Sequence, residues 1–91
     1  MIDVYIYPVT GKPYKKQISK NLTEYQKIVG GYIEICSHPI TEKFSFDSDE
    51  NNDSKVHLII NEEGHWLNLD RNENIKGIRG QCFIIRDIDF D

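Results

Sequence analysis

The apolar residues of this chain fall into short stretches of β-branched and aromatic side chains, and only one stretch has helical spacing. Residues 2–7 alternate between aliphatic and other side chains, which is the period of a β-strand with two different faces. The chain contains no alanine but fourteen isoleucines, so it lacks the best helix former and is rich in residues that favour strands. These features predict a fold dominated by a β-sheet.

Five stretches have the composition of strands, and residues 65–67 are predicted as the return arm of a further hairpin. The predicted strands are residues 2–7, 14–19, 32–36, 56–60 and 81–86. Residues 22–29 are predicted to form a helix that Asn21 or Thr23 caps. Gly30 and Gly31 end this helix, and one of them needs a positive φ so that the chain can reverse.

This order of elements predicts an α+β fold: a small, mostly antiparallel sheet of about five strands with one short helix packed on one face. The turn at residues 61–64 has hairpin length, and Gly64 is predicted to take the left-handed conformation there. With 91 residues, the chain is predicted to be a single domain spanning residues 1–91.

The net charge of −4 comes from one segment of the chain. Residues 47–53 contain four acidic residues and no basic one, and without them acidic and basic residues balance at 11 each. We expect residues 40–55 to form a mobile acidic insert, within which residues 47–53 contribute little to folding. Because the chain lacks a basic footprint, nucleic acid is not an expected partner.

The chain carries no apolar run of the ~20 residues that a membrane span requires. Its first residues lack the features of a signal peptide, so we expect a cytoplasmic protein without a membrane partner. Cys36 and Cys82 each stand inside an apolar run and are predicted to be buried, reduced thiols. The three histidines lack metal-ligand spacing, so neither a metal nor another cofactor is expected.

Three blocks of the sequence together resemble an uncharacterised family of domains of unknown function found in small phage, large-virus and bacterial proteins. The blocks are Val-Gly-Gly-Tyr-Ile-Glu at residues 29–34, the Asn-Glu-Glu-Gly turn at residues 61–64 with Leu69 and Asn72 after it, and Gly80 before the last strand. The resemblance spans about residues 2–86. It implies a viral or mobile-element origin, a small α+β fold and action inside the host cell, but no particular activity.

The densest group of polar residues lies around the turn at residues 61–64. The candidate ligand-binding residues are Asn61, Glu63, His65, Asn72 and Arg79. Amides can read the edges of a ring and an arginine can bind a phosphate, so this set is consistent with a nucleotide-like ligand. The alternative is that these residues only form turns and cap backbone groups. Catalysis with Glu62 or Glu63 as the base and His65 as the acid would require a pocket that shifts their pKa values.

Aromatic residues offer a second candidate surface. Tyr5, Tyr7 and Trp66 are the candidate interface residues, because aromatic side chains give a large contact area at low entropic cost. Tyr5 and Tyr7 share the strand face opposite the aliphatic one, so they can instead form a second core layer. A single short helix covers only part of one sheet face, which predicts a twofold homodimer.

Together these observations predict a non-enzymatic accessory protein of a virus or phage that acts as a protein-interaction module on a host or viral protein, such as a host factor. An oligomeric small-molecule binding protein for a nucleotide-like ligand is the alternative. A small hydrolase is placed third, after these two, because the sequence contains no recognised catalytic motif.

Overall fold

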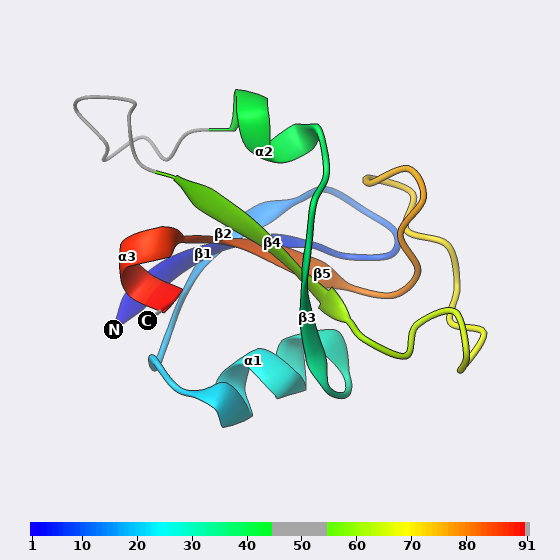
Figure 1. Ribbon diagram of the computed structural model, residues 1–91, viewed down its shortest axis with the longest axis horizontal. Helices are drawn as coiled ribbons and strands as arrows, with labels where there is room; N and C mark the ends of the chain where they lie inside the picture. The colour runs from blue at the N-terminus through cyan, green and yellow to red at the C-terminus, as the bar shows by residue number, and fades with distance from the viewer. Residues whose placement is uncertain (45–54, 91) are drawn as a thin grey trace.

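The computed structural model describes residues 1–44 and 55–90 of the chain (Figure 1). Its strands are β1 (Ile2–Tyr7), β2 (Tyr14–Ile18), β3 (Ile33–Cys36), β4 (Val56–Asn61) and β5 (Cys82–Arg86). They form one antiparallel sheet in the order β2-β1-β5-β4-β3. The helices are α1 (Leu22–Val29), α2 (Ile40–Lys43) and α3 (Asp87–Phe90). The predicted α+β class and the five-stranded sheet are therefore confirmed.

Helix α1 carries the chain from one edge of the sheet to the other. β2 and β3 are the two edge strands, and α1 crosses one face of the sheet between them (Figure 1). The Asn21 side chain caps the helix by accepting a hydrogen bond from the Glu24 N–H at 2.9 Å. Gly30 ends it with a φ of 79°, and the Gly30 and Gly31 N–H groups both donate to the Gln26 carbonyl. The predicted positive φ is confirmed at Gly30.

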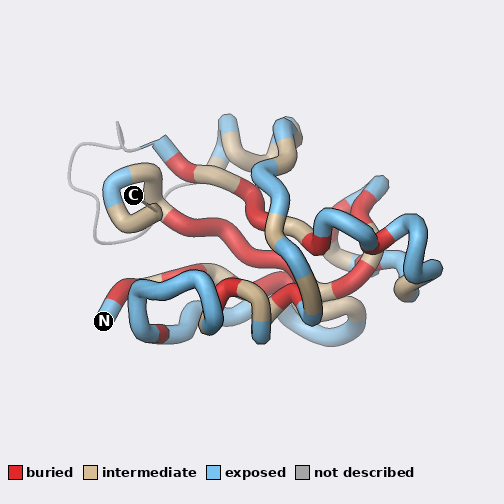
Figure 2. Tube along the Cα trace, turned by 60° about the horizontal axis from the view of Figure 1, so that its bottom comes forward, coloured by how far each residue is buried: buried red, intermediate tan, exposed pale blue. Residues whose placement is uncertain are grey.

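The hydrophobic core has two layers, one on each face of the sheet. On the first face, α1 contributes Tyr25 and Val29, which pack over the aliphatic side of β1 and over Phe83 of β5. On the second face, Ile40 and Phe44 pack from α2 and the residue that follows it, and Ile75 and Ile78 pack from the segment before β5. Buried residues accordingly run along the central strands (Figure 2). The prediction of a single helix on one face was therefore incomplete, because α2 and the segment before β5 cover the second face.

The predicted return arm at residues 65–67 is wrong. Residues 62–68 form turns, and β4 already pairs with β3 on one side and β5 on the other, so no side of β4 is free for this arm. Gly64 also lacks the predicted positive φ, whereas Asn68 in the same turn has a φ of 52°. Gly64 is needed for a different reason: a Cβ atom there would lie 3.0 Å from the Arg79 carbonyl oxygen.

The expected insert at residues 40–55 is described only in part. Residues 40–43 form α2, whose Ile40 packs against the second core layer. The acidic stretch at residues 47–53 lies outside the described residues. Within the described ranges, no helix combines the length and the apolar character required to cross a membrane.

Candidate functional site

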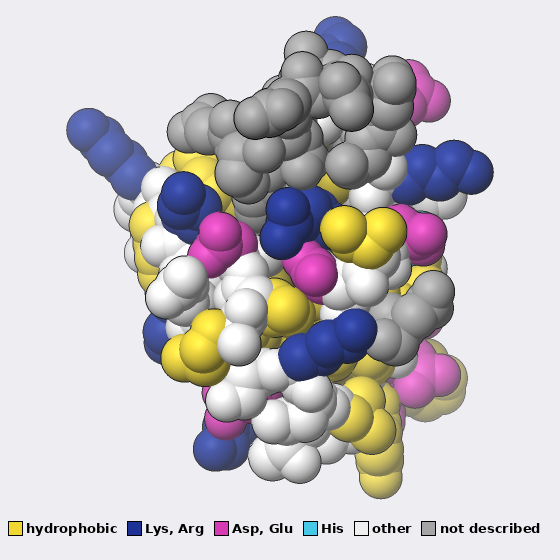
Figure 3. Space-filling view, turned by 90° about the vertical axis from the view of Figure 1, so that its left-hand side faces the viewer, with side chains coloured by type: hydrophobic (Ala, Val, Ile, Leu, Met, Phe, Trp, Pro, Cys, Tyr) yellow, Lys and Arg dark blue, Asp and Glu magenta, His cyan; other side chains and the backbone are white. Residues whose placement is uncertain are grey.

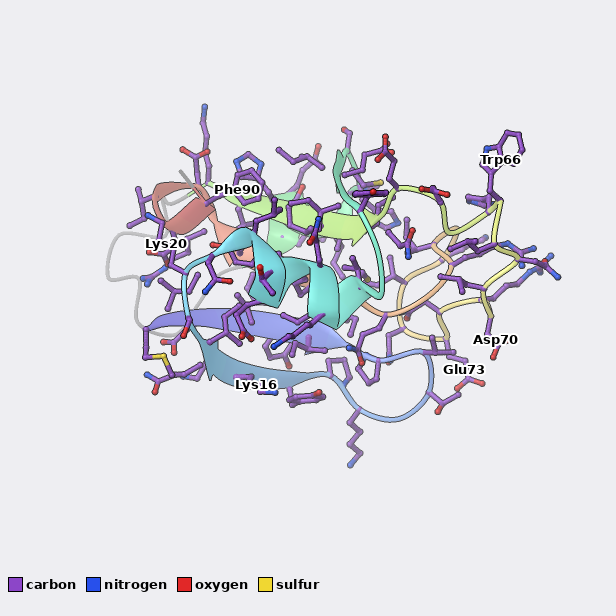
Figure 4. All side chains as sticks on the ribbon, turned by 90° about the horizontal axis from the view of Figure 1, so that it is seen from below. Lys16, Lys20, Trp66, Asp70, Glu73 and Phe90 are labelled. Carbon is purple, nitrogen blue, oxygen red and sulfur yellow. The ribbon has the colours of Figure 1, made fainter. Side chains whose placement is uncertain are left out.

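The candidate residues lie at the end of the molecule away from α3, where two loop segments meet. The turn at residues 62–68 and the segment at residues 69–81 form this loop end, where Trp66, Asp70 and Glu73 are seen (Figure 4). Arg71 and Arg79 pair as an isolated antiparallel bridge, and the Gly80 N–H donates to the Asp70 carbonyl at 2.8 Å. The loop end is therefore a paired, hydrogen-bonded structure.

Asn72 organises the segment at residues 69–81. Its side chain is buried, and its amide nitrogen donates to the carbonyls of Tyr7 and Gly80 at 2.9 and 3.0 Å. Its amide oxygen accepts hydrogen bonds from the N–H groups of Asn74 and Ile75 at 2.8 and 3.1 Å. Backbone groups thus occupy both donor and both acceptor positions of this side chain. In the structure, the Asn72 amide builds the loop.

Asn61 has a similar role at the end of β4. Its buried amide nitrogen donates to the Val29 carbonyl at 3.1 Å, and its oxygen accepts from the Glu63 N–H at 2.7 Å. It therefore ties the last turn of α1 to the turn at residues 62–68. Gly31 makes this possible, because a Cβ atom at that position would lie 2.9 Å from the Asn61 amide nitrogen.

Two separate hollows divide the predicted ligand residues. The larger is about 590 Å³, and most of the residues that line it are of polar or charged type, so we call it the cationic hollow. Its lining includes His65, Arg71, Asn72, Lys76 and Arg79. The smaller, about 230 Å³, is lined by Gln26, Gly31, Tyr32, Asn61, Glu63 and Leu67, and we call it the Leu67 hollow. The predicted set of five ligand residues is thus split between the two.

The sequence analysis missed two residues of the cationic hollow, Arg71 and Lys76. Arg71 stands eight positions before Arg79, and no periodicity of a helix or strand connects them. The pairing of the two segments brings them together. The presence of two of the chain's three arginines within ten residues was the available signal.

The predicted interface residues also occupy different places. Tyr7 is only 6% exposed and belongs to the second core layer, where its ring meets that of Tyr5 edge-on at 5.4 Å. Tyr5 also contacts the ring of Phe44, with ring centroids 5.1 Å apart. The sheet face on which the homodimer was predicted is therefore covered by the chain itself. Trp66, by contrast, is 90% exposed.

The thiols do not have the character of catalytic nucleophiles. Burial raises the pKa of Cys82 to about 12, with a smaller contribution from Cys36. Burial, followed by the charge of Glu34, also raises the pKa of Cys36. A thiol is reactive as the thiolate, and both groups are held in the protonated form at neutral pH. In the described ranges, no group of three or more histidine, cysteine, aspartate or glutamate side chains is arranged to hold a metal ion.

The free energy of unfolding is expected to fall as the pH rises from about 9 towards 12. The Cys82 thiol has a pKa of about 12 in the folded protein against its usual 9.0, so the unfolded chain loses this proton first. The protonated Cys82 thiol therefore contributes about 4 kcal/mol to the free energy of unfolding. This contribution is full below pH 9 and is lost as the pH rises through the folded-state pKa. Tyr7 acts in the same direction, because burial raises its pKa from 10.0 to about 12.

Urea unfolding of the parent and of Cys82→Val at a series of pH values tests this expectation. The variant removes one titrating group, so its unfolding free energy should fall less steeply between pH 9 and 11. Identical slopes for the two proteins would contradict a buried, protonated Cys82.

Comparison with known proteins identifies one family. A family model described as a domain of unknown function (DUF3846) matches residues 2–90. No curated protein and no solved structure matches the chain at a significant level.

Proposed function

The chain belongs to the DUF3846 family of domains of unknown function, and we propose that it acts as a non-enzymatic protein-interaction module. The observation that carries this proposal is the exposure of three large apolar side chains at the turn of residues 62–68 and at the residue paired with its start, Trp66, Leu67 and Tyr32, called here the Trp66 surface. These side chains are 90%, 55% and 64% exposed, respectively. Figure 4 shows the Trp66 side chain projecting away from the body of the molecule. Tryptophan and tyrosine are the residues that most often dominate binding energy at protein interfaces.

The turn that carries Trp66 is held in place by its own backbone. The Leu67 N–H donates to the Glu63 carbonyl at 2.8 Å, and the Leu69 N–H donates to the Gly64 carbonyl at 3.0 Å. The buried side chain of Asn61 fixes the start of the turn. A surface that is ordered before binding loses less conformational entropy when a partner docks.

The Trp66 surface continues into a hollow and a sheet edge. Tyr32 and Leu67 both line the Leu67 hollow, which can accept an apolar side chain. Tyr32 immediately precedes the edge strand β3, and its carbonyl accepts a hydrogen bond from the Glu62 N–H at 2.8 Å. Because pairing alternates along an antiparallel ladder, the backbone groups of Ile33 and Ile35 point away from β4. An extended segment of a partner can add a strand there.

The charges beside this surface indicate the chemistry of the partner. Glu63 lines the Leu67 hollow, and Glu62 stands next to it at the start of the turn, with both residues exposed. A segment with an apolar residue flanked by lysine or arginine would complement both features. The resemblance to small phage and large-virus proteins supplies the setting of the proposal, which is a viral or phage accessory protein that binds a host or viral protein in the host cytoplasm.

Substitution of Trp66 is expected to weaken partner binding by about 30-fold or more, since truncating such an anchor costs about 2 kcal/mol or more. The test is affinity capture from cells that naturally produce the protein, followed by measurement of the affinity for the captured polypeptide. Trp66→Ser is compared with Ile88→Ser, which removes a 67% exposed apolar side chain from α3 at the other end of the molecule. The control should bind as the parent does.

Equal binding by the Trp66 and Ile88 variants would contradict the proposed surface. If the captured polypeptide is a second copy of the chain, sedimentation equilibrium should show a dimer that Trp66→Ser dissociates. Retention of the dimer in that variant would place the contact elsewhere and exclude this surface as the site of self-association.

A further inference from the structure

We propose that the cationic hollow binds a small anion carrying two or more negative charges on phosphate groups, such as a nucleoside diphosphate. This inference is independent of the protein-interaction role, because the two surfaces use different residues. The hollow contains three permanent cations, Arg71, Lys76 and Arg79, and one carboxylate, Glu73. Its volume of about 590 Å³ lies in the range of small-molecule sites.

The backbone places the two arginines directly opposite each other. Arg71 and Arg79 are partners in an antiparallel bridge, so their side chains leave the backbone on the same side and begin about 5 Å apart. Two like charges in directly opposed positions repel each other. A bound anion between the guanidinium groups would replace this repulsion with attraction, and both groups can form paired hydrogen bonds to phosphate oxygens.

Within residues 1–44 and 55–90, no ion pair neutralises these three cations. Among the described residues, no carboxylate lies within ion-pairing distance of Arg71, Lys76 or Arg79. The ion pairs among the described residues lie outside the cationic hollow, as in the pair of Arg86 and Asp89. On the face around the chain termini, basic and acidic side chains lie interspersed (Figure 3). The cationic hollow thus differs from that face, although the chain as a whole carries a charge of −4.

Neutral groups hold the Arg79 guanidinium and the backbone at Lys76 in position. One terminal nitrogen of Arg79 donates to the Leu69 carbonyl at 3.0 Å and to the Asn68 amide oxygen at 3.3 Å, which orients the guanidinium without cancelling its charge. The Lys76 carbonyl accepts a hydrogen bond from the His38 ring at 3.0 Å, which anchors this part of the loop to the segment before α2. Positioned donors around a hollow are typical of a site that recognises phosphate.

Phosphate suits this charge better than a single carboxylate does. Three cations and one carboxylate leave a net charge of about +2, which a diphosphate group can match and one carboxylate cannot. Two arginines offer several donors in fixed planes, as the tetrahedral oxygens of phosphate require. The apolar side chain of Ile78 also lines the hollow and provides contact for a part of the ligand that carries no charge.

The test is a titration of the whole chain with sodium pyrophosphate and, separately, with ADP, followed by amide chemical shifts. We expect saturable shifts at Arg71, Lys76 and Arg79 with one ligand bound per chain. Arg71→Gln should weaken binding of both probes at least ten-fold. Lys16→Gln removes the same charge from β2, away from the loop end (Figure 4), and should change affinity less than two-fold. Trp66→Ser should bind both probes as the parent does, which separates this inference from the interaction role.

Arg71→Gln should also unfold at the same or a higher temperature without ligand, because it removes one of two opposed charges. If that variant fails to fold, Lys76→Gln replaces it with the same expected loss of affinity. The proposal is overturned by the absence of saturable shifts, or by equal weakening in the Arg71 and Lys16 variants. It is also overturned if a single-stranded oligonucleotide binds more tightly than either probe, since the ligand would then be a nucleic acid.

Discussion

Asn72→Asp is expected to lower the free energy of unfolding at pH 7 by roughly 3–5 kcal/mol. The substitution hardly changes the shape of the side chain, but it replaces the amide donors with a carboxylate oxygen. That oxygen would face the carbonyls of Tyr7 and Gly80, which now accept hydrogen bonds at 2.9 and 3.0 Å in a buried site. A buried charge facing two carbonyls loses its hydration and gains repulsion.

The pH dependence of this variant provides a second readout. Burial and the two carbonyls that face one of its oxygens raise the folded-state pKa of the new carboxyl above its unfolded value of about 3.9, and we expect them to outweigh the Asn74 and Ile75 N–H donors at the other oxygen. The protonated form is therefore favoured in the folded protein, and the variant should recover stability relative to the parent as the pH falls from 7 to 4. Asn21→Asp is the matched control, because aspartate caps a helix as well as asparagine does and the site is exposed. Urea unfolding that shows equal stability for both variants would contradict the role assigned to Asn72.

Gly31→Ala is expected to cost about 2–4 kcal/mol, and Gly30→Ala only about 1 kcal/mol. At Gly31 the new Cβ atom would lie 2.9 Å from the Asn61 amide nitrogen. Asn61 is buried and short, so it can move only by weakening its bonds to the Val29 carbonyl and the Glu63 N–H. At Gly30 a Cβ atom meets nothing within 4 Å, and the cost comes only from the φ of 79°.

Thermal or urea unfolding of the two alanine variants decides between these causes. Asn61→Ala in the Gly31→Ala background supplies the control, because removing the amide removes the collision. The double variant should be destabilised by less than the sum of the two single variants. Additive effects, or a larger loss at Gly30 than at Gly31, would contradict this account of the two glycines.

Much of the sheet could be predicted from local patterns. Residues 2–7 alternate in character along the strand, and this alternation correctly placed Ile2, Val4 and Ile6 on the face opposite Tyr5 and Tyr7. The helix at residues 22–29 was predictable from its spacing, its Asn21 cap and its terminal glycine, because all three signals lie within a few residues of one another.

The arrangement of the candidate site could be predicted only in part. Asn61 and Asn72 were recognised as polar residues at a turn, but turn residues and ligand-binding residues have the same composition. Their burial decides between these roles, and burial depends on Val29 and Tyr7, which are 32 and 65 positions away in the chain. Arg71 and Lys76 were missed for a different reason, because the bridge that brings Arg71 opposite Arg79 follows no periodicity of a helix or strand.

The sequence by itself therefore determined the strands, the α+β class and the main helix, because period, capping and turn chemistry act between near neighbours. The tertiary structure alone decided that the second sheet face is covered, that residues 65–67 leave the sheet, and that two arginines face each other across one hollow. The first two depend on which distant segments pair and exclude water, and the third depends on a bridge between residues eight positions apart. The packing of the whole chain around its two core layers determines which segments pair, and local sequence patterns do not indicate this pairing.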